Sequence, residues 1–278
     1  MLARAVGAEL FTQLKQPVVI ESRPGGGGML AAREVAGAAG DGYTLLLGTA
    51  GLLAITPMVK HVTYDPLRDF APITNAVELP NCLVVNKSLP VNSVAELIAY
   101  AKANPGKLSF GSSGINSTHH IAGELLKKMA GIKMVHVPYR GGNPAMIDLL
   151  GGQIQVLFAT VSTALPYIKG GKLKVLGVIE ARRSKALPNV PTIGETVPGY
   201  AVPPSFLGFL APAATPPALV HQINEAFVKA IQTPHVRKIL ERSGFEVVPG
   251  TPAEFDNLIK SAVERYRQII AEAHIKRQ

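Results

Sequence analysis

The chain has 278 residues, of which 47% are hydrophobic and 17% are charged, a profile that excludes an intrinsically disordered protein and allows a large core. The formal net charge is +9, but the basic residues are scattered singly or in pairs and only 6% of residues are aromatic. This pattern argues against a nucleic-acid surface and is compatible with binding of organic anions. The single cysteine, Cys82, lies in an apolar run, so we expect it to be buried and inert.

The first third of the chain alternates helix and strand patterns. Apolar residues at helical spacing predict a helix over 2–15, followed by a strand over 17–22, a helix over 29–38 and a strand over 43–48. Glu9 interrupts the first apolar stretch and no cleavage-site pattern follows, which argues against a secretory signal. No apolar run approaches the roughly 18 residues of a membrane span, so we expect a protein that is not inserted in a membrane.

Four consecutive glycines, 25–28, stand between the strand over 17–22 and the helix over 29–38. Gly26, Gly28 and Ala31 match a dinucleotide-binding G-x-G-x-x-A pattern. That fingerprint also needs an acidic residue about 20 positions later, at the end of the next strand, which ends instead in glycine and threonine. A phosphate loop would need Lys-Ser or Lys-Thr after the last glycine. We therefore interpret the segment as a turn and expect no cofactor.

The alternation continues to the C-terminus. The expected strands are 70–78, 81–87, 107–112, 133–139, 154–160, 173–179 and 206–212, and the expected helices are 93–103, 117–130, 143–151, 162–169, 216–232, 234–243 and 252–273. Such alternation predicts an α/β fold of mostly parallel sheets flanked by helices. Breaks near Pro105 and Pro204 predict a lobe over 105–206 inserted between the two parts of another lobe, 1–104 and 207–278.

The stretch SFGSSGINSTHH, Ser109–His120, carries the strongest chemical signal. A strand runs into a turn of small residues that opens a helix, so backbone N–H groups, serine hydroxyls and the positive end of a helix dipole meet, an arrangement that suits a carboxylate. The plainer interpretation is N-capping of the helix by a serine or asparagine. Other strand ends offer similar turns. The candidate ligand-binding residues at these turns are Thr49, Ala50, Ser112, Ser113, Gly114, Asn116, Ser117, Tyr139, Arg140 and Gly141.

Long ordered motifs resemble one known family. QPVVIESRPGGGG…YTLLLGT, YDPLRDFAPIT, VPYRGGNPAMIDLLGGQIQV and RRSKALPNVPTIGE are similar to the Bug family, the substrate-binding proteins of tripartite tricarboxylate transporters, essentially from end to end. The resemblance implies a periplasmic, monomeric receptor with a two-lobed, type II-like binding-protein fold, a hinge and an interlobe cleft. It implies a small carboxylate ligand, a membrane permease as partner, and no catalysis. It also adds His120, Thr160, Ser205 and Phe206 to the expected ligand site.

Departures from the family pattern are informative too. Family members have a signal peptide, a first strand and a PFPPGG ligand loop before the helix with which this chain starts, so we expect a shortened receptor with an unpaired sheet edge. Asn116 replaces the usual glycine, His119 is additional, and Ala159–Thr160 stands where an acidic FDN motif is usual. The missing carboxylate is expected to shift ligand preference away from amino-bearing acids.

Other function classes lack support in the sequence. GSSG is not the G-x-S-x-G of a hydrolase, because Ile115 stands where the last glycine belongs, and the trio Ser113, His120 and Asp148 has no supporting spacing. No zinc or calcium motif is present, so we expect neither an enzyme nor a metal site. Two alternatives stay open: a shortened paralogue that binds nothing, and the ligand-sensing module of a regulator with the same fold.

Overall fold

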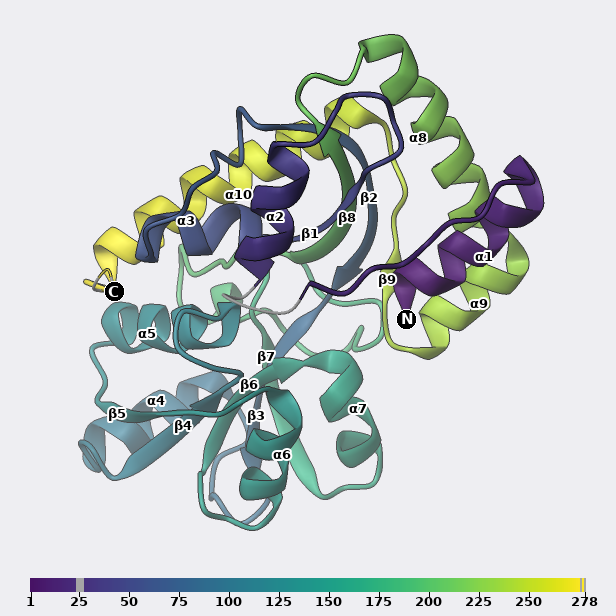
Figure 1. Ribbon diagram of the computed structural model, residues 1–278. Coiled ribbons are helices and arrows are strands. Elements are labelled where there is room, and N and C mark those ends of the chain that lie inside the picture. Colours follow the sequence, from purple (N-terminus) through teal and green to yellow (C-terminus); the bar gives the residue numbers. More distant parts are fainter. Residues whose placement is uncertain (24–27, 276, 278) are drawn as a thin grey trace. The chain divides into compact units, whose positions relative to one another are not determined.

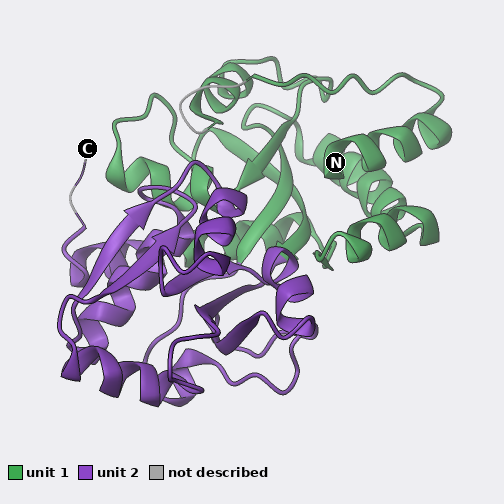
Figure 2. Ribbon diagram, turned by 90° about the horizontal axis from the view of Figure 1, so that it is seen from below, with its two compact units in different colours: residues 1–78, 205–264, 278 green, residues 79–204, 265–277 purple. Residues whose placement is uncertain are grey.

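The computed structural model describes residues 1–23, 28–275 and 277, and it divides into two compact units (Figure 2). Unit 1 comprises residues 1–78 and 205–264, and unit 2 comprises residues 79–204 and 265–277. The chain thus first enters unit 2 at Leu79, earlier than the break near Pro105 suggested. The reason is that the strand over 81–86 pairs inside the sheet of unit 2, so it and the helix after it belong to that unit.

Unit 1 is built on a four-stranded sheet, here sheet A, with the strand order β1-β8-β2-β9 (Figure 1). Its strands are β1 (Leu46–Thr49), β2 (Phe70–Leu79), β8 (Ser205–Pro212) and β9 (Glu246–Val247). Its helices are α1 (Leu2–Leu14), α2 (Met29–Ala36), the π-helix η2 (Gly51–Ile55), α3 (Thr56–Val59), α8 (Pro217–Gln232), α9 (Pro234–Arg242) and most of α10 (Pro252–Glu272). Strand β1 pairs with β8, and β2 with β9, in antiparallel register.

Unit 2 is built on a five-stranded sheet, here sheet B, with the strand order β5-β4-β6-β3-β7. Its strands are β3 (Asn81–Asn86), β4 (Leu108–Ser112), β5 (Met134–Pro138), β6 (Val156–Thr160) and β7 (Leu173–Val178). Its helices are α4 (Val94–Ala103), α5 (Thr118–Ala130), α6 (Gly142–Leu150), α7 (Val161–Lys169) and the short 3₁₀ helix η3 (Ile193–Glu195). Strand β4 is parallel to β5 and β6, whereas β3 is antiparallel to β6 and β7.

The α/β class with helix-flanked sheets is confirmed, but the sheets are mixed rather than mostly parallel. Among the pairings described, parallel neighbours are confined to β4 with β5 and β6. Strand β3 follows directly on β2, with only Pro80 between them, and enters sheet B in the opposite direction to β6. A strand that does not arrive through a helical crossover is under no constraint to be parallel to its neighbours.

Alternating side chains of sheet B pack on both of its faces. In β6, Leu157 and Ala159 join the cluster formed by α6 and α7, which also contains Cys82. Phe158 points the other way, edge-on to Phe110 of β4, whose ring lies against Gly123 of α5. The near-continuous burial of β3 and β6 follows, because strands covered on both faces have no solvent side. The expected burial of Cys82 is confirmed.

The segment expected to form a strand over 17–22 is not a strand. Residues 17–23 form no regular element, and Val18, Val19 and Ile20 are all exposed. A β-branched run becomes a strand only where a neighbouring strand supplies hydrogen bonds, and no pairing is recorded for residues 17–23. Of the glycine turn, residues 25–27 lie outside the described residues, and Gly28 is the N-cap of α2. No helix in the described residues has the length and apolar character to cross a membrane.

Candidate functional site

The candidate ligand residues of unit 2 meet at one edge of sheet B. Register shows that β4, β5, β6 and β7 all end, and β3 begins, at this edge, which we call the turn edge. Helices α5, α6 and α7 each start there, directly after β4, β5 and β6. The positive ends of three helix dipoles therefore collect at the turn edge, a local field that favours an anion.

The turn over 112–117 is held by its own serines. The Ser112 hydroxyl bonds to Gly114 O at 3.1 Å and to His136 Nε2 at 2.7 Å. The Ser117 hydroxyl donates to Gly114 O at 2.7 Å and accepts from His120 N, so Ser117 caps α5 as the plainer interpretation expected. Ser112 is fully buried. These two hydroxyls shape the turn, and their protons are not available to a ligand.

Ser113 is tied to a buried chain of polar groups. Its Oγ lies 2.8 Å from Nδ1 of His119, whose Nε2 lies 2.9 Å from Oδ1 of Asn81. The Asn81 amide Nδ2 donates to Glu180 Oε1 at 2.9 Å, and Asn81 N donates to the same oxygen at 3.0 Å. Burial lowers the pKa of His119 to about 4, so its ring is neutral near pH 7.

A hydroxyl, an imidazole and an amide in this order also resemble a nucleophilic triad. General-base catalysis near neutral pH needs an imidazole whose pKa lies near the working pH, whereas burial holds the pKa of His119 near 4. The trio Ser113, His120 and Asp148 is not assembled by hydrogen bonds: Ser113 bonds to His119, His120 accepts from Asn116 N, and Asp148 accepts from Tyr139. The contact with His119 therefore orients the Ser113 hydroxyl more than it activates this hydroxyl as a nucleophile.

A second histidine system lies behind the turn. The His120 and His136 rings stack with centroids 4.2 Å apart, and His136 stacks on Phe110 at 4.8 Å. Nδ1 of His120 accepts from the backbone N–H of Asn116, a residue with a φ of 62°. Burial, then the charges of His120 and Lys127, lower the pKa of His136 to about 4. The stacking and hydrogen bonds of the His120 and His136 rings hold the turn in this conformation.

Several hydrogen-bond donors at the turn edge, among them the following four, have no partner among the described residues. The backbone N–H groups of Ser113 and Ile115 have no acceptor among the described residues. The Asn116 Nδ2 is buried and, within the same set, unpartnered. Arg140 is exposed and makes no ion pair with any described residue. Two amide N–H groups, a side-chain amide and a guanidinium are donors suited to a carboxylate.

The strand-to-helix junction after β5 differs in part from the expectation. Tyr139 donates its hydroxyl proton to Asp148 Oδ2 at 2.7 Å, and burial and this bond raise its pKa to about 12. The phenol therefore already has an acceptor, and Arg140 is the donor that faces solvent here. Gly141 caps α6 with a φ of 115°, a conformation that favours glycine, and no side chain caps this helix.

The junction after β6 presents a cluster of hydroxyl groups. Thr160 Oγ1 lies 2.7 Å from Thr163 Oγ1 and accepts from Ser162 Oγ at 3.2 Å. Thr160 is the N-cap of α7, but its side chain makes no capping bond. This cluster is neutral, so it adds no charge that would repel a carboxylate.

Three of the four expected residues of unit 1 lie together at one edge of sheet A. Thr49 ends β1 opposite Leu207 of β8, which places it beside Ser205 at the start of that strand. Thr49 Oγ1 accepts from Leu52 N at 3.0 Å, and Ala50 is a buried residue that opens η2. Phe206, by contrast, is a core residue: its ring is 1% exposed and packs edge-on against Phe255.

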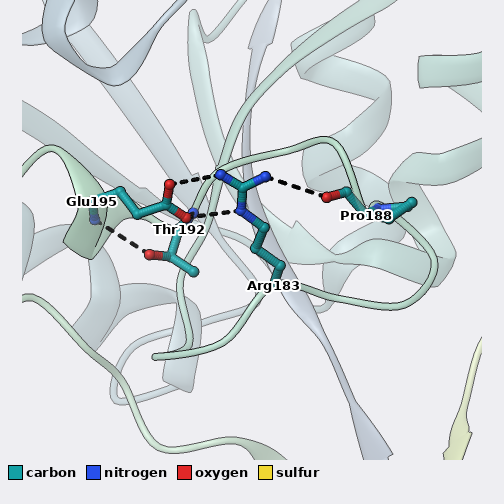
Figure 3. Close-up of polar contacts among 4 residues, drawn as sticks. All are labelled: Arg183, Pro188, Thr192 and Glu195. Carbon is teal, nitrogen blue, oxygen red and sulfur yellow. Dashed lines mark hydrogen bonds and ion pairs between the residues drawn. The ribbon is translucent and has the colours of Figure 1, made fainter.

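An exposed ion pair fixes the segment that follows Glu180. Arg183 Nε and Nη2 bind Glu195 Oε1 and Oε2 at 2.9 and 2.7 Å, and Arg183 Nη1 donates to Pro188 O (Figure 3). Thr192 and Glu195 form a capping box at η3 (Figure 3). The Arg183 contact and the Thr192 bonds lower the pKa of Glu195 to about 2. Because Val178 N donates to Pro191 O, this clamp lies directly beside the end of β7.

Sequence reasoning missed three residues of this site, which are Asn81, His136 and Glu180. Asn81 and Glu180 stand at or near strand termini, and His136 is in the middle of β5. All three have apolar neighbours in the sequence, and nothing local distinguishes them from capping or surface residues. Pairing brings Asn81 opposite Thr160, and the contact of Asn81 with His119 spans 38 residues. Only a correct prediction of the register in which β3 pairs would have placed Asn81 near Thr160 and His119.

Comparison with known proteins assigns the family. Residues 2–275 match the family described as the tripartite tricarboxylate transporter family receptor. The chain belongs to this family. BugT of Bordetella pertussis is 31% identical over 279 residues, which cover 99% of this chain and 85% of BugT. The Bug-type resemblance read from the motifs is thereby confirmed.

Solved structures of the same fold include two with ligands named. The structure of Rpa4515 from R. palustris with adipate is 35% identical, covers 99% of this chain and 93% of that chain, and gives a TM-score of 0.86. MatC (Rpa3494) from Rhodopseudomonas palustris with bound malate is 30% identical, covers 97% of this chain and 93% of its own, and gives a TM-score of 0.81. This family member is therefore similar to receptors of two dicarboxylic acids.

Proposed function

We propose that this family member is a receptor that captures a small organic acid at the turn edge of sheet B and delivers it to the membrane permease of a tripartite transporter. The observation that carries the proposal is a set of donors that have no partner among the described residues, Ser113 N, Ile115 N, Asn116 Nδ2 and Arg140, at the start of α5 and α6. The relatives with adipate and malate support the ligand class. Their family supports the permease partner and a periplasmic location.

The donors have different parts in the proposed binding. Backbone N–H groups at the start of a helix bind an oxyanion without losing side-chain entropy, so the turn over 113–116 holds one carboxylate. The Arg140 guanidinium supplies a charge-assisted bond and strengthens long-range attraction of an anion, to which the net charge of +9 also contributes. Thr160, Ser162 and Thr163 offer neutral contacts nearby. Binding by these groups requires no metal, cofactor or bond cleavage.

A panel of mono-, di- and tricarboxylates in thermal unfolding tests the ligand class. An acid present at 100 times its dissociation constant adds about 2.7 kcal/mol of stability to the folded state, which raises the melting temperature by several degrees. We expect at least one dicarboxylate to do so. If no acid raises the melting temperature, the non-binding paralogue is the better description. If an acid raises the melting temperature only of a chain fused to a signalling domain, the ligand-sensing module is the better description.

Replacing Arg140 by alanine tests the placement of the site. We expect Arg140→Ala to weaken binding of a dicarboxylate about tenfold, because a hydrogen bond to a charged group contributes about 1.5–3 kcal/mol when well formed and less when exposed. Isothermal titration calorimetry measures the change. Lys172→Ala is the matched control, because it also removes an exposed positive charge, but at the opposite edge of sheet B, before β7.

The two variants separate local contact from general charge attraction. If Arg140→Ala and Lys172→Ala weaken binding equally, the effect is that of net charge alone and the ligand does not bind beside Arg140. An unchanged affinity in both variants would likewise place the ligand elsewhere. Melting temperatures without ligand check that both variants are folded.

A further inference from the structure

The orientation of Asn81 is fixed by its partners. Both hydrogens of its Nδ2 are used, on Leu79 O at 2.9 Å and on Glu180 Oε1 at 2.9 Å. The reversed amide would place an oxygen against these two oxygens, which is repulsive, so the observed orientation is the one the network allows. Oδ1 of Asn81 therefore faces His119 as an acceptor.

This orientation determines the tautomer of His119. Nε2 lies 2.9 Å from Asn81 Oδ1, an acceptor, and so carries the proton. The ring is buried, with 7% of its surface exposed, and burial keeps it neutral near pH 7 because it lowers the pKa to about 4. A neutral ring with a proton on Nε2 has a lone pair on Nδ1. Ser113 Oγ, 2.8 Å from Nδ1, must then be the donor of that bond.

The direction of the Ser113–His119 hydrogen bond determines what the Ser113 hydroxyl can offer a ligand. A serine hydroxyl has one proton, and here that proton is directed into the protein. The half-buried Ser113 oxygen therefore offers a ligand only lone pairs, beside the free N–H groups that attract a carboxylate. An oxygen of this kind accepts a bond from a ligand hydroxyl and is repelled by a second carboxylate oxygen.

We infer that Glu180, Asn81 and His119 are positioning residues that make Ser113 an obligatory hydrogen-bond acceptor, so that the site selects an acid with a hydroxyl group beside its carboxylate. The inference rests on the proposed function, because it assumes a carboxylate at the turn edge. The ligand hydroxyl donates to Ser113 Oγ while the adjacent carboxylate accepts from the backbone. The neutral hydroxyl cluster around Thr160 leaves an ammonium group without the negative partner that it would need.

Malate and succinate provide a matched pair of probes, because they differ by one hydroxyl group on the same four-carbon diacid. We expect the protein to bind malate about three- to tenfold more tightly than succinate, the usual range for one net hydrogen bond. Ser113→Ala should abolish this preference through weaker malate binding, with succinate binding unchanged or stronger. Ser109→Ala, at the other end of β4, is the control and should keep the preference.

The hydrogen-bond chain from Glu180 through Asn81 and His119 to Ser113, here called the relay, can be tested without a ligand. ¹⁵N NMR of the histidine rings at pH 7 should show His119 with a proton on Nε2 and a bare Nδ1. His119→Phe frees the Ser113 proton to donate to a carboxylate, so the malate preference should fall as in Ser113→Ala. If His119→Phe does not fold, the Ser113→Ala titration and the NMR tautomer still decide.

The outcomes separate this inference from the proposed function. Equal affinities for malate and succinate in the unmodified protein, or an equal loss of both in Ser113→Ala, overturn the inference and leave the proposed function standing. A proton on Nδ1 of His119 overturns the relay. Binding of neither probe, together with no response to any acid of the carboxylate panel, overturns both.

Discussion

Every serine hydroxyl of the turn over 112–117 already bonds within the protein. Ser112, Ser113 and Ser117 each have a partner at 2.7–2.8 Å. The sequence suggests hydroxyl donors for a carboxylate, because serines before a helix are a common anion site. The structure shows instead that the serine hydroxyls bond within the turn and give it its shape. In the proposed site the donors are therefore backbone N–H groups, the Asn116 amide and Arg140.

At the same scale, His136 makes stability depend on pH. The folded-state pKa is about 4 because of burial and the charges of His120 and Lys127, whereas an unfolded histidine has a pKa of about 6.5. The folded pKa is the lower one, so its contribution to stability is fully present above about pH 6.5 and is lost as the pH falls towards 4.

His136→Gln tests this dependence. We expect the variant to be less stable than the unmodified protein at pH 7.5, and the gap to narrow by about 1 kcal/mol by pH 4.5, a value discounted because the ring is partly exposed. Urea unfolding at each pH measures it. His235→Gln, at an exposed histidine of α9, is the control substitution. A constant gap between pH 7.5 and 4.5 would contradict the assignment.

At the scale of elements, periodicity predicted most helices and strands to within a few residues. It works because α4, α5 and α8 each have one apolar face, and because local capping, such as the bond that Ser93 accepts from Glu96 N at the start of α4, marks where a helix begins. The strand expected over 17–22 is wrong, because a strand needs a partner that the local sequence does not contain. The direction of β3 and the Asn81–His119 contact also depend on long-range pairing.

The packing of α5 on β4 depends on the absence of a side chain at Gly123. A Cβ there would lie 2.2 Å from one atom of the Phe110 ring and 2.7 Å from two others. Phe110 is fully buried and its ring contacts those of His136 and Phe158. Steric overlap should therefore outweigh the helix propensity that alanine adds.

Gly123→Ala is accordingly expected to destabilise the protein. Overpacking costs about 1–3 kcal/mol, sometimes more, against a gain of about 1 kcal/mol in helix propensity. Thermal unfolding measures the difference. Gly142→Ala in α6, where a Cβ meets nothing within 4 Å, is the control and should be neutral or slightly stabilising. A Gly123→Ala variant at least as stable as the unmodified protein would contradict the close packing described.

At the scale of the whole molecule, each unit has its own sheet and its own core, and the chain passes between the units at residues 78/79, 204/205 and within α10. The motifs indicated the family correctly, and with it the α/β class, because they are long and ordered along the entire chain. The crossing near residue 79 could not be read from composition, since Pro80 is one of 22 prolines in the chain. The hinge and cleft implied by the resemblance stay predictions.

Amide hydrogen–deuterium exchange with and without a saturating dicarboxylate tests the central claim most directly, because it reports whether an acid binds and which backbone groups it protects. We expect added protection at residues 113–118 and 140–144, where the free N–H groups and the helix starts lie, and no change at the opposite edge of sheet B around residues 151–154 and 171–173. Binding that protects neither the turn over 113–118 nor the start of α6, or the absence of binding by every acid of the panel, would contradict the account.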